Sequence, residues 1–178
     1  FPEWHEARLG KISSSNIYKL MPESRKKGEP SATAMSYVMK LVAETMTGMS
    51  DSFHNSAMEW GTEQEPNAIL EYEAITFQKV EECTFFECEE YPLFGGSPDG
   101  LVEDGKGIIE VKCPFNTEIH LDTVLNGMPK HHVYQVQSNM LLTNTEYCDF
   151  ISYDPRILND HKLYVQRIER DEALVEKM

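Results

Sequence analysis

A carboxylate and an amine lie two residues apart in a stretch that has the composition of a buried strand. Glu110 and Lys112 belong to the segment IIEVKCP. Alternate residues of a strand point to the same face, so a strand over residues 107–113 places both charged side chains on one side, among apolar neighbours. A charge in such surroundings is costly unless it is paired or bound to a metal ion. The segment predicts either a simple Glu110–Lys112 ion pair or a site that uses both groups.

Asp99 favours the second possibility. It lies in SPDG, on the strand that precedes the turn EDGKG, and a hairpin there brings it beside Glu110. Two carboxylates at a strand end form an oxygen-rich site suited to Mg²⁺, which keeps several waters. A neighbouring lysine can orient a water or stabilise charge on a phosphate. These are the groups needed to hydrolyse a phosphodiester.

Charge is distributed unevenly along the chain. The net charge of −14 argues against a protein that coats nucleic acid, because phosphate affinity comes from lysine and arginine. Residues 1–40 carry seven basic and four acidic residues, whereas the remaining 138 carry nine basic and 26 acidic residues. If DNA binds, we expect the N-terminal segment to supply much of the contact.

Length and composition predict one globular domain over residues 1–178. Hydrophobic residues make up 40% and charged residues 26% of the chain, which is typical of a globular protein with a core. The sequence shows no apolar run of membrane-spanning length and no leader peptide, so we expect a cytoplasmic protein without a membrane contact. The four cysteines form no CxxC pair and are expected to be reduced thiols.

The N-terminal half reads as mainly helical. A short helix is expected in KISSSNIYKLM, with Ser13 or Ser14 as its cap. A second helix should begin at Ser31 and end near Gly48. Its apolar residues recur at helical spacing and are expected to fill the core; they are Met35, Val38, Met39, Val42 and Met46. A third helix over residues 56–74 contains Pro66, which should kink it or mark a new first turn.

The C-terminal half reads as strands with interspersed helices. Strands are expected at residues 77–80, 83–88, 93–102, 107–113, 147–153 and 162–168, and helices at 117–125 and 130–142, before an acidic helical tail. This order predicts an α/β fold with a mixed central sheet flanked by helices.

Several segments together resemble a known family. The residues PD and EVK fit the PD-(D/E)xK nuclease pattern, with ten residues between Asp99 and Glu110. In order, WHEARLGKISSS, WGTEQEPNA, GGSPDGLVEDGKGIIEVKCP, YQVQ and YDPR with LYVQRIERDE resemble the lambda-exonuclease and YqaJ-type viral recombinase exonucleases. The resemblance covers nearly the whole chain and implies a restriction-endonuclease-like α/β fold.

The resemblance also implies roles for individual residues. Asp99 and Glu110 match metal ligands, with the Val111 carbonyl as a third ligand, and Lys112 matches the catalytic lysine. Glu65 matches a helical acid that contacts the metal through water; its neighbour Glu63 is the competing choice, and either is otherwise a solvated helix glutamate. Gln135 matches a glutamine that lines the site, while Gln137 should point away by helical geometry. A buried structural glutamine is the alternative for Gln135.

A phosphate pocket is implied near the N-terminus. Arg8 and Ser15 match residues that hold a 5′-phosphate, and the hydroxyl of Ser13 and free amides at a helix start would add to it. From the residues alone, ordinary helix capping is the better explanation of the serines, and the resemblance reverses this order for Ser15 and Arg8 together. Three basic residues form a loop that could touch the duplex backbone or simply be solvated; they are Arg25, Lys26 and Lys27. His131 and His132 are assigned no catalytic role.

The function implied by the resemblance is a Mg²⁺-dependent 5′→3′ exonuclease, with Mn²⁺ as a substitute ion. Such an enzyme degrades one strand of linear double-stranded DNA from a 5′-phosphorylated end and leaves a 3′ single strand for recombination. The resemblance further implies a ring-shaped homotrimer, a single-strand annealing protein as partner, and a phage or prophage origin in a bacterial cell.

Two other functions are open at this point. The first is a different nuclease with the same catalytic core, either an endonuclease or a CRISPR-associated enzyme with an iron–sulfur cluster. The second is a non-enzymatic acidic protein that mimics DNA, which the net charge suggests.

Overall fold

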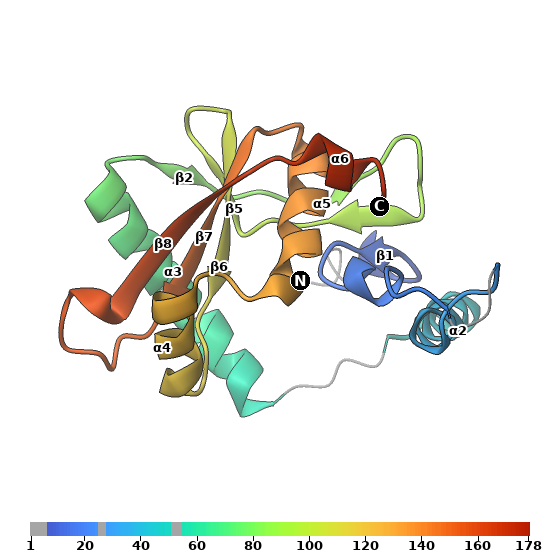
Figure 1. The fold of residues 1–178 in the computed structure, drawn as a ribbon, viewed down its shortest axis with the longest axis horizontal. Helices are drawn as coiled ribbons and strands as arrows, with labels where there is room; N and C mark the ends of the chain where they lie inside the picture. Colours follow the sequence, from blue (N-terminus) through green and yellow to red (C-terminus); the bar gives the residue numbers. More distant parts are fainter. Residues whose placement is uncertain (1–6, 25–27, 51–54) are drawn as a thin grey trace.

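A five-stranded mixed sheet forms the centre of the protein (Figure 1). The computed structural model describes residues 7–24, 28–50 and 55–178. The strand order is β2–β5–β6–β7–β8, and the bounds are Val80–Glu81 for β2, Gly100–Val102 for β5, Gly107–Lys112 for β6, Tyr147–Tyr153 for β7 and Leu163–Glu169 for β8. Strands β6 and β7 pair in parallel and the other neighbours are antiparallel. The expected α/β fold with a mixed central sheet is confirmed.

A second, three-stranded sheet brings the N-terminal segment close to the hairpin formed by β5 and β6. Its order is β1–β4–β3, with bounds Ile12–Ser13 for β1, Phe86–Glu87 for β3 and Phe94–Gly96 for β4. The strand expected over residues 93–102 is therefore two strands in different sheets. The chain crosses between the sheets at residues 97–99, and Asp99 lies at the end of this crossing.

Helices cover both faces of the central sheet. The long helix α3 (Ser56–Thr76) packs on β6, β7 and β8, whereas α5 (Val133–Thr143), which follows the 3₁₀ turn η2 (Lys130–His132), packs on the opposite face. Helix α4 (Thr117–Asn126) contacts β7, and the short α6 (Glu172–Val175) contacts α5. None of the helices in the described ranges has the length and apolar character needed to cross a membrane.

Successive side chains of β6 point to opposite faces of the sheet, as expected, and the core is accordingly divided into two clusters. Ile109 and Val111 pack with Ala68 and Tyr72 of α3. Ile108 instead packs under α5, in a cluster with Val136, Met140, Cys148 and Phe150. Because neighbouring β6 residues face opposite helices, Glu110 and Lys112 are fixed on the α5 side.

The apolar stripe of α2 does not fill the core, so this expectation was wrong. The helix spans Ala32–Thr47, and its caps are Ser31, which accepts the Ala34 amide at 3.1 Å, and the left-handed Gly48. The buried side of α2 carries Ala34, Tyr37 and Glu44 instead. The stripe is exposed, up to 82% at the last position; its members are Met35, Val38, Met39, Val42 and Met46. Periodicity identifies residues on one face but does not specify which face packs, and α2 lies at the side of the molecule farthest from β8 (Figure 1).

The helix expected in the serine-rich segment is also absent. Ser13 belongs to β1, and only the three-residue 3₁₀ turn η1 (Ile17–Lys19) follows, without a side-chain cap from Asn16. The reason is pairing with β4, since the Ser14 amide donates to the Gly95 carbonyl at 3.0 Å. Helix α3, in contrast, continues through Pro66, which therefore does not mark a new first turn.

Gly96 permits the close approach of three segments, and we expect Gly96→Ala to destabilise the fold. A Cβ at this position would lie 1.9 Å from Ser14 Oγ, 2.4 Å from Asn139 Oδ1 and 2.9 Å from Leu142 Cδ1. Overpacking of this kind costs about 1–3 kcal/mol of unfolding free energy, which urea titration measures. Gly61→Ala is the matched control, because nothing lies within 4 Å of that Cβ and alanine in a helix adds about 1 kcal/mol. Equal stabilities for the two variants would contradict the packing argument.

Candidate active site

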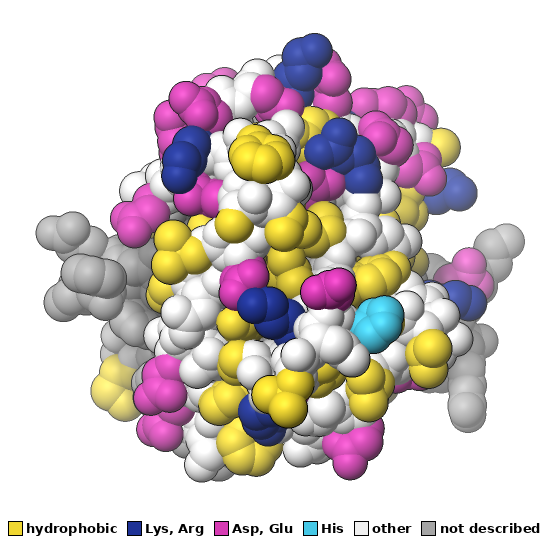
Figure 2. Space-filling view, turned by 90° about the vertical axis from the view of Figure 1, so that its left-hand side faces the viewer, with side chains coloured by type: hydrophobic (Ala, Val, Ile, Leu, Met, Phe, Trp, Pro, Cys, Tyr) yellow, Lys and Arg dark blue, Asp and Glu magenta, His cyan; other side chains and the backbone are white. Residues whose placement is uncertain are grey.

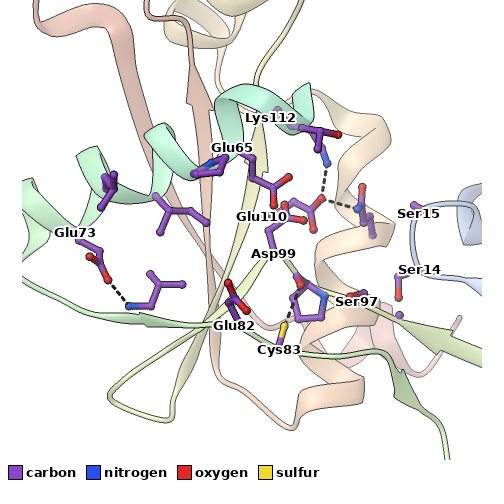
Figure 3. Close-up of a pocket in the computed structure, with 18 of the residues that line it drawn as sticks. Ser14, Ser15, Glu65, Glu73, Glu82, Cys83, Ser97, Asp99, Glu110 and Lys112 are labelled. Carbon is purple, nitrogen blue, oxygen red and sulfur yellow. Dashed lines mark hydrogen bonds and ion pairs between the residues drawn. The ribbon is translucent and has the colours of Figure 1, made fainter. Parts of the chain in front are cut away.

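A cleft of about 860 Å³ lies between α3, the sheet crossing, β6 and the Ser14–Ser15 loop (Figure 3). Elements distant in sequence meet here because β1 pairs with β4 and because β5 and β6 form a hairpin. The polar and charged side chains that line the cleft are Arg8, Ser14, Ser15, Thr62, Glu65, Glu73, Glu82, Cys83, Ser97, Asp99, Glu110, Lys112 and Gln135.

Glu110 is the most deeply buried carboxylate of the cleft, with 1% of the residue exposed. Its Oε1 pairs with Lys112 Nζ and accepts from Gln135 Nε2 at 2.5 Å, and its Oε2 accepts from Asn139 Nδ2 at 3.2 Å. Burial raises the pKa of Glu110 to about 7; the Lys112 charge opposes this shift and the Asp99 charge adds to it. The carboxylate is thus held from three sides, yet its charge is only partly compensated.

Asp99 lies where the chain enters β5 and is fastened to β6 at two points. Its amide donates to the Ile109 carbonyl at 3.2 Å, and its Oδ2 accepts the Val111 amide at 2.6 Å. Burial raises the pKa of Asp99, whereas the Lys112 charge and the Val111 hydrogen bond lower it in part. The turn therefore brings Asp99 beside Glu110, as the sequence pattern predicts.

Lys112 and Glu65 complete the group from two different elements. Burial alone would lower the pKa of Lys112, but the Glu110 and Asp99 carboxylates outweigh it and raise that pKa. Glu65 reaches from α3 toward the same carboxylates (Figure 3), and its pKa is raised to about 7 by burial and by the Asp99 charge, against the effect of Lys112. The neighbouring Glu63 is exposed.

Asp99 and Glu110 are the two buried carboxylates of the cleft whose oxygens could serve as metal ligands. Asp99 and Glu110 offer hard oxygen ligands, and burial raises the pKa of both carboxyl groups although the Lys112 charge lowers it in part. In the described ranges, no three histidine, cysteine or acidic side chains are grouped to hold a metal ion by themselves. An ion at this place would keep water ligands, which suits Mg²⁺ better than a metal that prefers a closed protein site.

The residues expected to hold phosphate lie partly in the same cleft. Arg8 and Ser15 line it, as does Ser14, whose hydroxyl donates to the Gly95 carbonyl at 3.4 Å. Ser13 does not line the cleft; its hydroxyl lies 3.2 Å from Ser15 Oγ and accepts from Asn16. Burial lowers the pKa of Arg8, against the Tyr37, Asp99 and Glu110 charges, so these carboxylates lie near enough to act on the guanidinium.

One part of the phosphate prediction is wrong, and another is not tested. The expected helix start is absent, so amides of a helix N-terminus do not contribute. Arg25, Lys26 and Lys27 lie outside the described residues.

Asn139 is a hydrogen-bond partner of Glu110 that the sequence reasoning missed. Asn139 is fully buried, and its amide and that of Gln135, about one helical turn away in α5, donate to the two oxygens of Glu110. The spacing of four residues between two amides could have indicated a shared target. Gln137 points away, as expected, since it donates to the Glu169 carbonyl at 2.9 Å and accepts the Asp171 amide at 2.8 Å.

None of the histidines in the described part of the chain lines the cleft. His120 is buried between Ser152 Oγ at 2.8 Å and the His161 carbonyl at 2.7 Å, which is a structural role. Burial lowers the pKa of His132 to about 3.

Comparison with known proteins identifies the family. The YqaJ-like viral recombinase domain matches residues 3–146. An alkaline exonuclease, LHK-Exo from Laribacter hongkongensis, is 38% identical, with a TM-score of 0.89 over 99% of this chain and 86% of that chain; its complex with dAMP gives a TM-score of 0.90. A phage-related exonuclease from Haemophilus somnus 129PT shares the fold at 21% identity, with a TM-score of 0.78 over 94% of this chain and 87% of that chain. A search of curated proteins found no significant match. This chain belongs to the YqaJ-like viral recombinase family.

The raised pKa of Glu65 predicts a pH-dependent effect of Glu65→Gln in metal-free protein. Between pH 4.5 and about 7 the folded state binds more protons at this group than the unfolded state, so its contribution to stability falls as pH rises. The variant should therefore unfold like the wild type below pH 4.5. Above pH 7 it should be more stable by about 1–3 kcal/mol, with partial exposure lowering the figure.

Urea unfolding at pH 4 and pH 8 in the presence of EDTA measures this difference. Glu63→Gln is the control, because that side chain is exposed on the same helix. A gain in stability that is the same at both pH values, or equal in the two variants, would contradict the assignment.

Proposed function

We propose that this protein is a deoxyribonuclease, specifically an exonuclease that acts on linear double-stranded DNA. The observation that carries the proposal is the convergence of Asp99, Glu110, Lys112 and Glu65 in one cleft. The family and the likeness to an alkaline exonuclease support the same reaction class.

The cleft residues suit metal-assisted hydrolysis of a phosphodiester. Asp99 and Glu110 would hold the ion with the Val111 carbonyl, and Glu65 would contact it through a water. When bound, Mg²⁺, or Mn²⁺ in its place, acts as a Lewis acid and lowers the pKa of a bound water. Lys112 orients the attacking water or stabilises the charge that develops on the phosphate. Gln135 and Asn139 keep Glu110 in place through its two oxygens.

We also propose that the enzyme works in the 5′→3′ direction. Arg8 and Ser15 lie in the same cleft as the carboxylates, so a terminal 5′-phosphate bound there would place the next phosphodiester near Lys112. A guanidinium can bind phosphate through two parallel hydrogen bonds. Each cut creates a new 5′-phosphate that can enter the same place, and the complementary strand remains as a 3′ single strand for recombination.

The two alternative functions find less support. The four cysteines are free thiols, and the described residues offer no cysteine cluster that could hold iron and sulfur. A DNA mimic does not need carboxylates and a lysine gathered in a cleft, whereas Asp99, Glu110 and Lys112 line the same cleft. An endonuclease with the same catalytic group differs only in whether it needs a DNA end, which closed circular DNA tests.

A homotrimer and a single-strand annealing protein are proposed as partners, in the cytoplasm of a bacterial host. The face in Figure 2 carries acidic and basic side chains interleaved with apolar ones, without a continuous basic area among its described residues. A ring would reconcile this surface with DNA binding, because basic residues would need to line only its channel.

Lys112→Ala should abolish most nuclease activity. The substitution removes the group that faces both the carboxylates and the phosphate, and loss of one such interaction costs about 100-fold or more in kcat. The assay follows release of nucleotides from linear duplex DNA with Mg²⁺, and circular dichroism verifies folding. Lys106→Ala, in the exposed turn of the same hairpin, is the matched control. Undiminished cleavage by Lys112→Ala would overturn the catalytic assignment.

A 5′-phosphorylated duplex should be degraded faster than the same duplex with a 5′-hydroxyl. Charge-assisted hydrogen bonds are worth about 1.5–3 kcal/mol, so we expect a preference of at least about tenfold. Arg8→Ala and Ser15→Ala should reduce this preference while EDTA abolishes cleavage of both substrates. Equal rates on the two ends in the wild type would refute the phosphate pocket, and rapid cleavage of closed circular DNA would favour an endonuclease.

A further inference from the structure

The loop that follows β7 contains an arginine with contacts to three separate segments. Arg156 donates from Nε and Nη2 to the two oxygens of Asp154 at 2.7 and 2.8 Å. It also donates from Nη1 to the Phe115 carbonyl at 2.9 Å and from Nη2 to the Pro114 carbonyl at 3.2 Å. One guanidinium thus joins the end of β7 to the loop that leaves β6.

Asp154 fixes the orientation of this guanidinium. Its side chain is fully buried and accepts further hydrogen bonds from Thr117 Oγ1 at 2.8 Å and from the Arg156 amide at 3.0 Å. Burial would raise the pKa of Asp154, but these hydrogen bonds outweigh it and lower the pKa to about 2. The Asp154 carboxylate therefore stays ionised at neutral pH, and it keeps both hydrogen bonds from the planar Arg156 guanidinium.

The free face of the same guanidinium packs on α3. The Arg156 Cζ lies 4.6 Å from the centroid of the Trp60 ring, and Phe115 meets that ring edge-on at 6.4 Å. A guanidinium over an indole is a favourable cation–π contact, and here it is made by an arginine whose side chain is 42% exposed. Trp60 precedes Glu65 by five residues in the same helix.

The turns of α3 before Pro66 contain no buried residue, so a contact such as that between Trp60 and Arg156 matters for their position. The buried residues of α3, Ala68 and Tyr72, both follow Pro66. Pro66 lacks an amide hydrogen, so the Thr62 carbonyl receives no helical hydrogen bond from it, and the helix is weakened directly beside Glu65. Packing after the proline therefore does not by itself fix the turns before it.

We propose that Arg156 is a positioning residue that sets the separation between Glu65 and Lys112. It holds the carbonyls two and three residues after Lys112 and, through Trp60, the turns of α3 that lead to Glu65. It touches neither catalytic side chain. The kinetic consequence rests on the proposed nuclease function, whereas the mechanical coupling does not.

The chain offers a matched control in Arg167. This residue binds both oxygens of Asp149 at 2.8 Å each, and its Cζ lies 3.6 Å from the centroid of the Tyr147 ring. The chemistry repeats that of Arg156, but the pair joins β7 to β8 and involves neither the loop after Lys112 nor the first turns of α3.

The experiment compares Arg156→Ala, Arg156→Lys and Arg167→Ala with the wild type. It measures kcat and KM on a 5′-phosphorylated linear duplex, Tm, and amide hydrogen exchange over residues 57–65. Arg156→Ala should lower kcat about tenfold to 100-fold with little change in KM, because displacement by an ångström misaligns the reacting groups. It should also speed exchange over residues 57–65. Millimolar guanidinium should restore part of kcat, and lysine should restore less than the native arginine provides.

Arg167→Ala should lower Tm at least as much, yet keep kcat within about twofold and leave exchange over residues 57–65 unchanged. The proposal is overturned if Arg156→Ala keeps the wild-type kcat, or if the two alanine variants lose kcat in proportion to Tm. It is also overturned if exchange over residues 57–65 does not respond to Arg156→Ala. If the wild type cleaves no DNA, the proposed function fails. The hydrogen-exchange experiment still decides whether Arg156 holds residues 57–65 of α3 in place.

Discussion

The cost of burying the Glu110 carboxylate is the constraint on which the surrounding structure depends. A nearly inaccessible charge is tolerated only with close partners, and this one takes three: Lys112 on its own strand, and Gln135 and Asn139 from α5. The helix must therefore lie directly over β6, with its two amides one turn apart. Gly96 permits this proximity, because any larger residue would meet Asn139 and Ser14.

The second organising feature is the chain crossing between the two sheets. Residues 94–96 pair with β1 and β3, whereas residues 100–102 pair with β2 and β6. The crossing carries Asp99 into the group formed by Glu110 and Lys112. The same arrangement brings Ser14 and Ser15 to the cleft, since β1 lies beside β4. One change of sheet thus assembles the acidic group and the neighbouring serines.

The sequence predicted the features that depend on local pattern. Alternation in β6, the hairpin that brings Asp99 to Glu110, the caps of α2 and the bounds of β7 all follow from neighbouring residues. The apolar stripe of α2 was wrongly predicted to lie in the core, because helical periodicity shows which residues share a face but not whether that face packs against the rest of the protein. Ser13 was assigned to a helix from its local capping preference, but strand pairing with Gly95, 82 positions away, outweighs that preference. Asn139 was missed although its four-residue spacing from Gln135 is visible in the sequence, whereas the contact between Trp60 and Arg156 depends on tertiary proximity, which a single sequence does not reveal.

The composition of the cleft wall has an electrostatic consequence for any polyanion that enters. Five carboxyl groups line the space, at Glu65, Glu73, Glu82, Asp99 and Glu110, against the two cations Arg8 and Lys112. Most proteins that bind DNA lose affinity steeply as monovalent salt rises, because counterions are released from phosphates by basic side chains. In this cleft, added salt also screens the repulsion between the carboxylates of the protein and the phosphates of the bound polyanion. The two effects oppose each other, so the acidic wall should make the dependence of polyanion binding on ionic strength shallower than Arg8 and Lys112 alone would make it.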